Sequence, residues 1–275
     1  MDNHSKAFLK WAGGKRKLLP KLLPLIGSPD VFIEPFCGSG VVWLNVESEK
    51  YLINDLNTDL ISLFKELKKD GQQFIDYAQQ FFSPTSNSSE VFYEFRERFN
   101  SLDVGDSERS ALFVYLNRHC FNGLCRYNKS GGFNVPYGKY KNPQFPTEAI
   151  NLFAEKSKKA DFISIDFKEV FDIANDISVD KNVTIYCDPP YIPLSETSSF
   201  TSYSPSSFGL VQQEQLATCV NNSRHKVVVS NSDTPRTREL YKNLNLQELI
   251  VSRTISAKAS SRKKVSEIIA INKKA

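Results

Sequence analysis

The sequence predicts an α/β fold in which a mostly parallel sheet alternates with helices and a helical insertion interrupts the alternation. The first observation is an opening in the order strand, helix, strand, helix. Apolar strand patterns occupy 31–33 and 51–53, a helix is expected to begin near Val41 after a glycine turn, and Asp59 to Leu67 has helical apolar spacing. Alternation of this kind favours parallel strands joined by helices.

The second observation is a change of character in the middle third of the chain. Segments 92–99 and 111–117 have helical spacing, and 120–140 is a loop rich in glycine, asparagine and aromatic residues. Such dense turn chemistry does not suit a sheet, and exposed loops commonly carry recognition. We therefore expect a recognition insertion at 58–145, and a core made of 1–57 and 146–275.

The third observation is that strand patterns resume after Ala160. They occupy 162–165, 183–187 and 227–230, with a helical segment at 211–219. At the end, two strand-like segments flank a basic turn. These segments are 248–256 and 265–271. They predict a C-terminal antiparallel hairpin.

Composition excludes several classes of protein. No segment approaches the roughly 18 consecutive apolar residues of a membrane span, and the first residues lack an apolar signal core, which favours a cytoplasmic location. The five cysteines are scattered without a Cys-x-x-Cys pair, so neither a disulfide framework nor a metal site is expected. The net charge of +4 is mild, but basic residues cluster near both ends and in the middle. These clusters suit either contacts with phosphates or an ordinary solvated face.

A glycine turn and an acid indicate a nucleoside-bearing cofactor. Gly38 and Gly40 follow the first strand, where a missing side chain lets the backbone turn close to a ligand, and Asp55 ends the second strand, where a carboxylate can bind ribose hydroxyls. NAD and S-adenosylmethionine both fit, and a purely structural turn is the alternative. Trp43 stands where a dinucleotide fingerprint has its third glycine, which argues against a cradled pyrophosphate.

The segment Asp188-Pro189-Pro190-Tyr191 is the sharpest chemical signal. It follows an apolar strand at once, and its two prolines fix φ and donate no backbone hydrogen bond. The Asp188 carboxylate and the Pro189 carbonyl can accept both hydrogens of an exocyclic amino group, and the Tyr191 ring can stack on a flipped base. Two such bonds favour a pyramidal nitrogen whose lone pair points at a methyl donor, and the carboxylate stabilises the positive charge that develops. A proline-stiffened loop with a buried tyrosine is the alternative.

Together these motifs resemble the Dam family of DNA adenine-N6 methyltransferases, which modify GATC sites. The segments Phe8–Lys15, Glu34–Gly40, Asn54-Asp55 and Asp188–Tyr191 are similar to the family's motifs, in the order of the α group of amino-methyltransferases. The resemblance implies a Rossmann-like, metal-free core that binds S-adenosylmethionine and releases S-adenosylhomocysteine. It implies cofactor contacts from Trp11, Lys15, Glu34, Phe36, Gly38, Gly40, Asp55 and Asp188. Taken alone, Trp11 would be read as a core aromatic and Lys15 as a surface charge.

The segment Asn117–Asn128 resembles the family's target-recognition hairpin. The resemblance implies that Arg126 contacts a guanine through two hydrogen bonds and that Lys10 contacts the other outer guanine. It also implies apolar contacts to thymine methyls from Leu124 and Pro136.

The resemblance of this segment also implies that Phe121, beside Asn122, wedges into the stack that the flipped base leaves. Three positions depart from the family's pattern. Phe121 replaces the usual tyrosine, His119-Cys120 is unusual, and Lys139 replaces an arginine. Phe121 has no hydroxyl for a polar contact, and Lys139 lacks the guanidinium fork. An ordinary surface turn is the alternative for the whole loop.

Rival functions differ at a few residues. A cytosine-N4 methyltransferase usually has serine at the place of Asp188, and C5 methylation needs a Pro-Cys pair, which this sequence lacks. A non-catalytic DNA-binding protein of the same fold would be expected to lose Asp188 or the glycine turn. The sequence thus predicts a monomeric adenine-N6 methyltransferase that flips an adenine out of duplex DNA, with cytosine-N4 methylation and DNA binding without catalysis as the alternatives.

Overall fold

The computed structural model describes residues 4–191, 208–252 and 264–272, which form two compact units. The first unit comprises Met1–Leu19, Cys37–Asn45 and Asp55–Ser164, and the second comprises Pro20–Phe36, Val46–Asn54 and Ile165–Ala275. Each unit is described by itself. The predicted recognition insertion, 58–145, lies wholly within the first unit.

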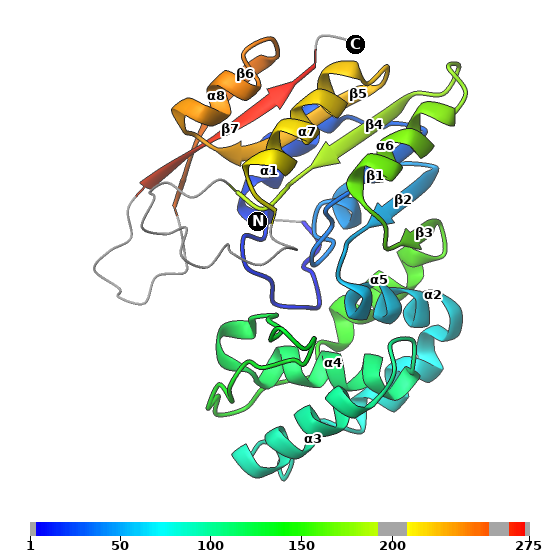
Figure 1. Ribbon diagram of the computed structural model, residues 1–275. Coiled ribbons are helices and arrows are strands. Elements are labelled where there is room, and N and C mark those ends of the chain that lie inside the picture. The colour runs from blue at the N-terminus through cyan, green and yellow to red at the C-terminus, as the bar shows by residue number, and fades with distance from the viewer. Residues whose placement is uncertain (1–3, 192–207, 253–263, 273–275) are drawn as a thin grey trace. The chain divides into compact units, whose positions relative to one another are not determined.

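The second unit is built on a sheet that is parallel over four strands (Figure 1). Its strands are β2 (Lys50–Asn54), β1 (Val31–Glu34), β4 (Val183–Cys187), β5 (Lys226–Ser232), β7 (Lys264–Ile271) and β6 (Asn245–Ser252), in that order. Strand β1 pairs in parallel with β2 and β4, and β4 with β5, whereas β7 is antiparallel to both β5 and β6. The chain therefore leaves β1 toward β2 and later returns to β4 on the other side of β1. Ligands of open α/β sheets commonly bind at the carboxyl ends of strands next to such a reversal.

Burial explains the strands of this sheet. All five residues of β4 are buried, and in β1 Ile33 pairs with both Leu52 and Ile185 in the centre of the sheet. Continuous apolar segments are typical of parallel strands covered on both faces. The helices of this unit are α1 (Leu19–Ile26), α6 (Phe167–Asp176), α7 (Leu210–Asn222) and α8 (Pro235–Leu240).

The first unit is mainly helical. It contains α2 (Thr58–Gln79), α3 (Ser89–Ser101), α4 (Ser107–His119), α5 (Thr147–Ser157), the strand β3 (Ala160–Ile163) and the 3-10 turns η1 (Arg16–Leu18), η2 (Trp43–Asn45) and η3 (Phe121–Gly123). Helix α4 is buried along most of its length and contacts α2 and α3. Asn57, Ser88 and Asp106 cap α2, α3 and α4 by accepting backbone N–H groups. Aromatic rings hold the unit together, with Phe153 at 4.5 Å from Phe64 and 5.0 Å from Trp43.

The predicted fold class is confirmed, including the C-terminal antiparallel pair β6–β7. The basic turn expected between these two strands lies outside the described residues. Helices α1, α5, α6 and α8 were not predicted; Pro24 interrupts α1, and α8 is only six residues long.

The helix predicted to begin near Val41 is wrong. The chain forms only the short turn η2 there, and β2 begins at Lys50. The Asn45 side chain donates from Nδ2 to the Val41 carbonyl at 2.8 Å, which occupies the acceptor that a continuing helix would use. The segment between the glycine turn and β2 is therefore short, and its Val41 carbonyl already has a hydrogen-bond donor, so it does not continue as a helix.

None of the helices in the described ranges is long and apolar enough to cross a bilayer.

Candidate functional site

The turn after β1 depends on two glycines with positive φ. Gly38 has a φ of 48° and Gly40 a φ of 75°, values that glycine adopts far more readily than other residues. A Cβ on Gly38 would lie 2.7 Å from Nε1 of Trp11, and a Cβ on Gly40 would clash with the indole of buried Trp43. The backbone can therefore turn sharply and lie against Trp11 because both side chains are absent.

Asp55 joins this turn to the start of α2. Its Oδ2 accepts from the Gly38 backbone N–H at 2.9 Å, and its Oδ1 accepts from the Asn57 N–H at 2.9 Å. Burial raises the pKa of Asp55, and the two backbone donors oppose that rise. Each carboxylate oxygen has two lone pairs, so both can still accept a hydroxyl proton. This arrangement can bind a vicinal diol such as a ribose.

Trp11 and Lys15, the two N-terminal residues predicted to bind the cofactor, differ in burial and in contacts. Trp11 is half-buried and packs on Gly38. Lys15 is only 5% exposed, and its Nζ donates to the Gly13 carbonyl at 2.9 Å. The interpretation of Lys15 as an ordinary surface charge is therefore wrong. A buried ammonium group is held close to the glycine-rich segment that contains Gly13 and Gly14.

In the second unit, the Asp188–Tyr191 tetrad leaves the carboxyl end of β4. Pro189 is buried, Asp188 and Tyr191 are half-buried and Pro190 is exposed. The Tyr191 hydroxyl donates to Oε2 of Glu267 on β7 at 2.8 Å. Burial, followed by the nearby carboxylates of Asp188 and Glu267, raises the pKa of Tyr191 well above its usual value. The phenol therefore stays protonated, and its ring is anchored to the sheet.

A second brace acts on the tetrad through its backbone. The Pro190 carbonyl accepts from Nε2 of Gln213 on α7 at 2.7 Å, and Oε1 of Gln213 accepts from Asn231 on β5 at 3.0 Å. Both amide side chains are buried, with at most 1% exposure. The corner is thus held from a neighbouring strand and a helix, beyond the stiffness of its prolines.

Glu34 and Phe36, the other predicted cofactor residues of this unit, lie at the carboxyl end of β1 and just after it. Glu34 is buried. The Phe36 ring packs against Phe167 at 5.5 Å and Phe208 at 5.4 Å. Because β1 and β4 are adjacent, Glu34 and the tetrad occupy the same edge of the sheet.

In the first unit, the recognition segment after α4 forms a small antiparallel structure. Isolated β-bridges pair Cys120 with Tyr137 and Tyr127 with Phe133. The Phe121 N–H also donates to the Pro136 carbonyl at 2.8 Å. The segment therefore has a defined backbone although it belongs to no sheet.

Most of the side chains predicted to contact DNA are accessible on this segment. Phe121 is 50% exposed, and Asn122 and Lys139 are exposed with a φ of 54° each. Arg126 and Pro136 are exposed and Leu124 is half-buried. Lys10 joins them from the N-terminal segment, with its Nζ 3.3 Å from the Arg118 carbonyl, to which it donates, and 3.9 Å from the centre of the Tyr140 ring. Burial and then the Arg118 charge lower the pKa of Lys10.

The guanidinium of Arg126 is already oriented. Its Nε donates to Oδ1 of Asn134 at 2.8 Å and its Nη2 donates to the Asn134 carbonyl at 3.1 Å. Within the described residues Nη1 makes no hydrogen bond, and Nη2 keeps a second proton. A fixed guanidinium edge is the geometry that two hydrogen bonds to a guanine require.

A buried ion pair between Asp59 and Arg109 anchors the same hairpin through Tyr127. Oδ2 of Asp59 accepts from the Tyr127 hydroxyl at 2.7 Å, and the two carboxylate oxygens accept from Nε and Nη2 of Arg109 at 2.6 and 3.1 Å. Arg109 also donates to the carbonyls of Phe99 and Leu102. A buried pair with its donors satisfied in this way fixes local geometry more than it adds stability.

Sequence reasoning missed these braces. Only Asn231 follows an apolar segment, whereas Asp59, Arg109 and Gln213 stand among other polar residues, so their sequence context does not mark them as buried. Their partners are also distant in sequence, so the pattern alone could not name them.

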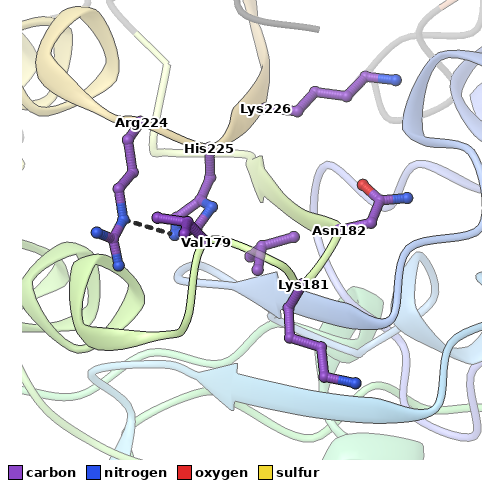
Figure 2. A pocket seen from close by; sticks show the side chains of 7 residues that line it. Val179, Lys181, Asn182, Arg224, His225 and Lys226 are labelled. Carbon is purple, nitrogen blue, oxygen red and sulfur yellow. Dashed lines mark hydrogen bonds between the residues drawn. The ribbon is translucent and has the colours of Figure 1, made fainter.

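A cavity of about 350 Å³ lies at the opposite, amino-terminal edge of β4 and β5 (Figure 2). Its lining includes Lys181, Arg224, His225 and Lys226. Figure 2 shows Lys181 and Lys226 pointing in different directions, while Arg224 Nε lies 3.4 Å from Nε2 of His225. Arg224 also donates to the Ile177 carbonyl. The cations do not converge, so this cavity is not a built anion site.

Metal-ligating groups do not gather in the described part of the chain, where no three His, Cys, Asp or Glu side chains could hold an ion together. The five cysteines are free thiols. Burial raises the pKa of Cys120 to about 12 and that of Cys125 to about 11, so both stay protonated at neutral pH.

The chain is similar to one protein family and to several named relatives. Residues 11–255 match the family model of the D12 class N6 adenine-specific DNA methyltransferases. The chain is 44% identical over 270 residues to a DNA adenine methylase of Vibrio cholerae, covering 97% of this chain and 95% of the relative. It is 43% identical over 272 residues to the DNA adenine methylase of Escherichia coli K12, covering 98% and 96%. A DNA adenine methylase of Serratia marcescens is 42% identical over 271 residues, covering 97% and 98%.

Proposed function

The chain belongs to the D12 class of N6 adenine-specific DNA methyltransferases, and from that premise we propose that it transfers a methyl group from S-adenosylmethionine to a flipped adenine in GATC sites of duplex DNA. The family fixes the reaction as adenine-N6 methylation of DNA. The observation that carries the residue assignments is the braced tetrad at the carboxyl end of β4.

The tetrad residues receive the adenine in this proposal. Asp188 and the Pro189 carbonyl accept the two hydrogens of the amino group, and the Tyr191 ring stacks on the base. Asp188 also stabilises the positive charge that grows on the nitrogen, and it takes the proton that the nitrogen must lose. The Gln213 and Glu267 bonds support this assignment because they hold the backbone of Pro190 and the ring of Tyr191 without consuming the Pro189 carbonyl.

The cofactor contacts come from the glycine turn and its surroundings. Asp55 has lone pairs for the ribose hydroxyls, and Gly38 lets the turn lie against the Trp11 indole. Lys15 is assigned to the carboxylate of the methionine part, with Glu34, Phe36 and Gly40 completing the set. S-adenosylmethionine supplies an electrophilic methyl group when it is bound here. The donor set is made of nitrogen, oxygen and aromatic groups, which suits a nucleoside.

Target recognition belongs to the segment after α4. Arg126 and Lys10 contact the two outer guanines, Leu124 and Pro136 contact thymine methyls, and Phe121 with Asn122 fills the place of the flipped base. Lys139 contacts the DNA beside them. The orientation of the Arg126 guanidinium by Asn134 supports its assignment. GATC is the target that the resemblance of this residue set to the recognition segment of the Dam family favours.

Methyl transfer to defined duplexes tests the proposal. The protein is incubated with radiolabelled S-adenosylmethionine and a duplex that contains one GATC, and the product is digested with nucleases that differ in sensitivity to adenine methylation at that site. We expect label in N6-methyladenine and protection of GATC alone. Label in N4-methylcytosine, or equal label in a duplex without GATC, would contradict the chemistry or the target, respectively.

A further inference from the structure

Three asparagine side chains of the first unit bind backbone segments by the same pattern, and two of these segments carry predicted DNA contacts. Oδ1 of Asn117, on α4, accepts from the Lys10 N–H at 2.8 Å, and its Nδ2 donates to the Lys10 carbonyl at 2.8 Å. Oδ1 of Asn100, on α3, accepts from the Phe133 N–H at 2.8 Å, and its Nδ2 donates to the Phe133 carbonyl at 3.2 Å. We call each pair an amide clamp, because one carboxamide binds the N–H and the C=O of a single residue as a neighbouring strand would.

The Asn117 clamp controls the position of Lys10. Asn117 is 1% exposed and lies 107 residues from Lys10 in sequence. Its Nδ2 also lies 3.3 Å from the Gly123 carbonyl, to which it donates. Gly123 has a φ of 61°, and a Cβ there would clash with the Lys10 side chain. The clamp and the missing side chain of Gly123 together fix the path on which Lys10 approaches the turn of Phe121.

The Asn100 clamp controls the hairpin of Arg126. Phe133, which it binds, pairs with Tyr127 in a β-bridge. The next residue, Asn134, donates its N–H to the Arg126 carbonyl at 3.0 Å and accepts from the Arg126 guanidinium at 2.8 Å. The backbone that Asn100 binds therefore leads directly into Asn134, which bonds to both the carbonyl and the guanidinium of Arg126.

We propose that Asn117 is the positioning residue for Lys10 and Asn100 the positioning residue for Arg126, so that each clamp sets discrimination at one outer base pair of the target. The inference rests on the proposed function, in which Lys10 and Arg126 contact the outer guanines. Each amide acts through the backbone of its partner segment. The two clamps bind different segments from different helices, so their effects on discrimination are separable.

Steady-state kinetics on four-base variants of the target tests the proposal. The substrates are hemimethylated duplexes, in which only one target adenine can react, with either outer G·C pair replaced by A·T. The readout is the ratio of kcat/KM for the intact site to kcat/KM for each altered site. Lys10→Ala and Arg126→Ala identify which outer pair each residue reads.

The two clamp variants should lower discrimination at opposite outer base pairs of the target. Since a good base contact is worth on the order of tenfold in discrimination, Asn117→Ala should lower the ratio at the Lys10 pair by about fivefold and leave the other ratio within about twofold. Asn100→Ala should do the reverse. A merely structural role would lower both ratios together, or neither.

Asn45→Ala is the matched control. Asn45 forms the same clamp on Ser5, earlier in the N-terminal segment, with bonds of 2.8 and 3.1 Å. Loss of this clamp should change neither ratio. If Asn117→Ala does not fold, Gly123→Ala displaces Lys10 without removing the amide, and it should lower the same ratio as Lys10→Ala does.

The outcomes separate the two levels of the account. If Lys10→Ala and Arg126→Ala each lower one ratio but the clamp variants do not follow them, the positioning roles are overturned and the guanine contacts stand. If neither Lys10→Ala nor Arg126→Ala changes a ratio, the guanine contacts fail and the positioning roles fail with them.

Discussion

The residues assigned to chemistry and those assigned to recognition are positioned by different means. Asp188 and Tyr191 leave the end of a fully buried parallel strand, so sheet register and two side-chain bonds place them. Arg126 and Phe121 belong to no sheet and depend on isolated bridges, amide clamps and a buried ion pair. Chemistry that is the same for every substrate can be placed by the common fold, whereas target choice is placed by a few replaceable polar contacts. Changes in the two regions should therefore have separable effects on rate and on discrimination.

The largest expected effect follows loss of the tetrad acid. Asp188→Ala should lower kcat by on the order of 10³-fold, because an acceptor that stabilises developing charge is lost. DNA affinity should change little, since the phosphate contacts and the contacts to the outer base pairs lie elsewhere. Single-turnover methyl transfer and a DNA-binding titration measure the two quantities. Retention of most activity would rule out the role assigned to this carboxylate.

A pH effect on stability should arise in the first unit. His119 is buried, its Nδ1 lies 2.9 Å from the Tyr115 carbonyl, and burial lowers its pKa to about 4. The folded state therefore favours the neutral imidazole, because its folded-state pKa lies below the ordinary value of 6.5. The stability that the neutral imidazole contributes is complete above pH 6.5 and is lost as the pH falls toward 4.

Urea unfolding at pH 7 and pH 4.5 measures that contribution. The wild type should lose about 2–3 kcal/mol more than His119→Phe does over this interval, since the variant has no group to protonate there. Equal losses in both proteins would show that the imidazole is not held neutral by the fold.

Arg126→Ala should sharpen the comparison from the recognition side. We expect a loss of about 1–3 kcal/mol of discrimination at one outer base pair, with kcat on the intact site much less affected. Competition between the intact site and singly altered sites gives the number. Uniform loss of activity on every site, with discrimination unchanged, would show that another residue makes the guanine contact.

The smallest expected effect concerns the tyrosine anchor. Tyr191→Phe keeps the ring but loses the hydrogen bond to Glu267, so kcat should fall by about threefold to tenfold, as expected for one hydrogen bond. Glu267→Gln retains a hydrogen-bond acceptor for the Tyr191 hydroxyl, so its kcat should fall less. A larger loss of kcat in Glu267→Gln than in Tyr191→Phe would mean that the Glu267 carboxylate does more than accept the hydrogen bond from Tyr191.

The sequence predicted the parts that depend on local pattern. Apolar segments gave β1, β2, β4 and β5, and the residues that follow the first three of these strands include Gly38, Asp55 and Asp188. Local pattern failed at Val41, where a side chain of Asn45 satisfies the backbone in place of a helix.

The braces could not be predicted because they depend on contacts between distant residues. Asn117 binds Lys10 across 107 residues, and Asn100 binds Phe133 across 33. An asparagine at a helix end has the same sequence signature whether it faces solvent or binds a segment folded back onto it. The residues assigned to chemistry therefore stand in recognisable local patterns, whereas the residues that orient the recognition segment do not.

One measurement tests the separation of the two regions most directly. kcat/KM is determined for wild type, Tyr191→Phe and Arg126→Ala on GATC and on sites with one outer pair altered. We predict that Tyr191→Phe lowers every value by one common factor, whereas Arg126→Ala lowers the value for GATC far more than the value for one altered site. Selective loss in Tyr191→Phe, or a common factor in Arg126→Ala, would contradict the account.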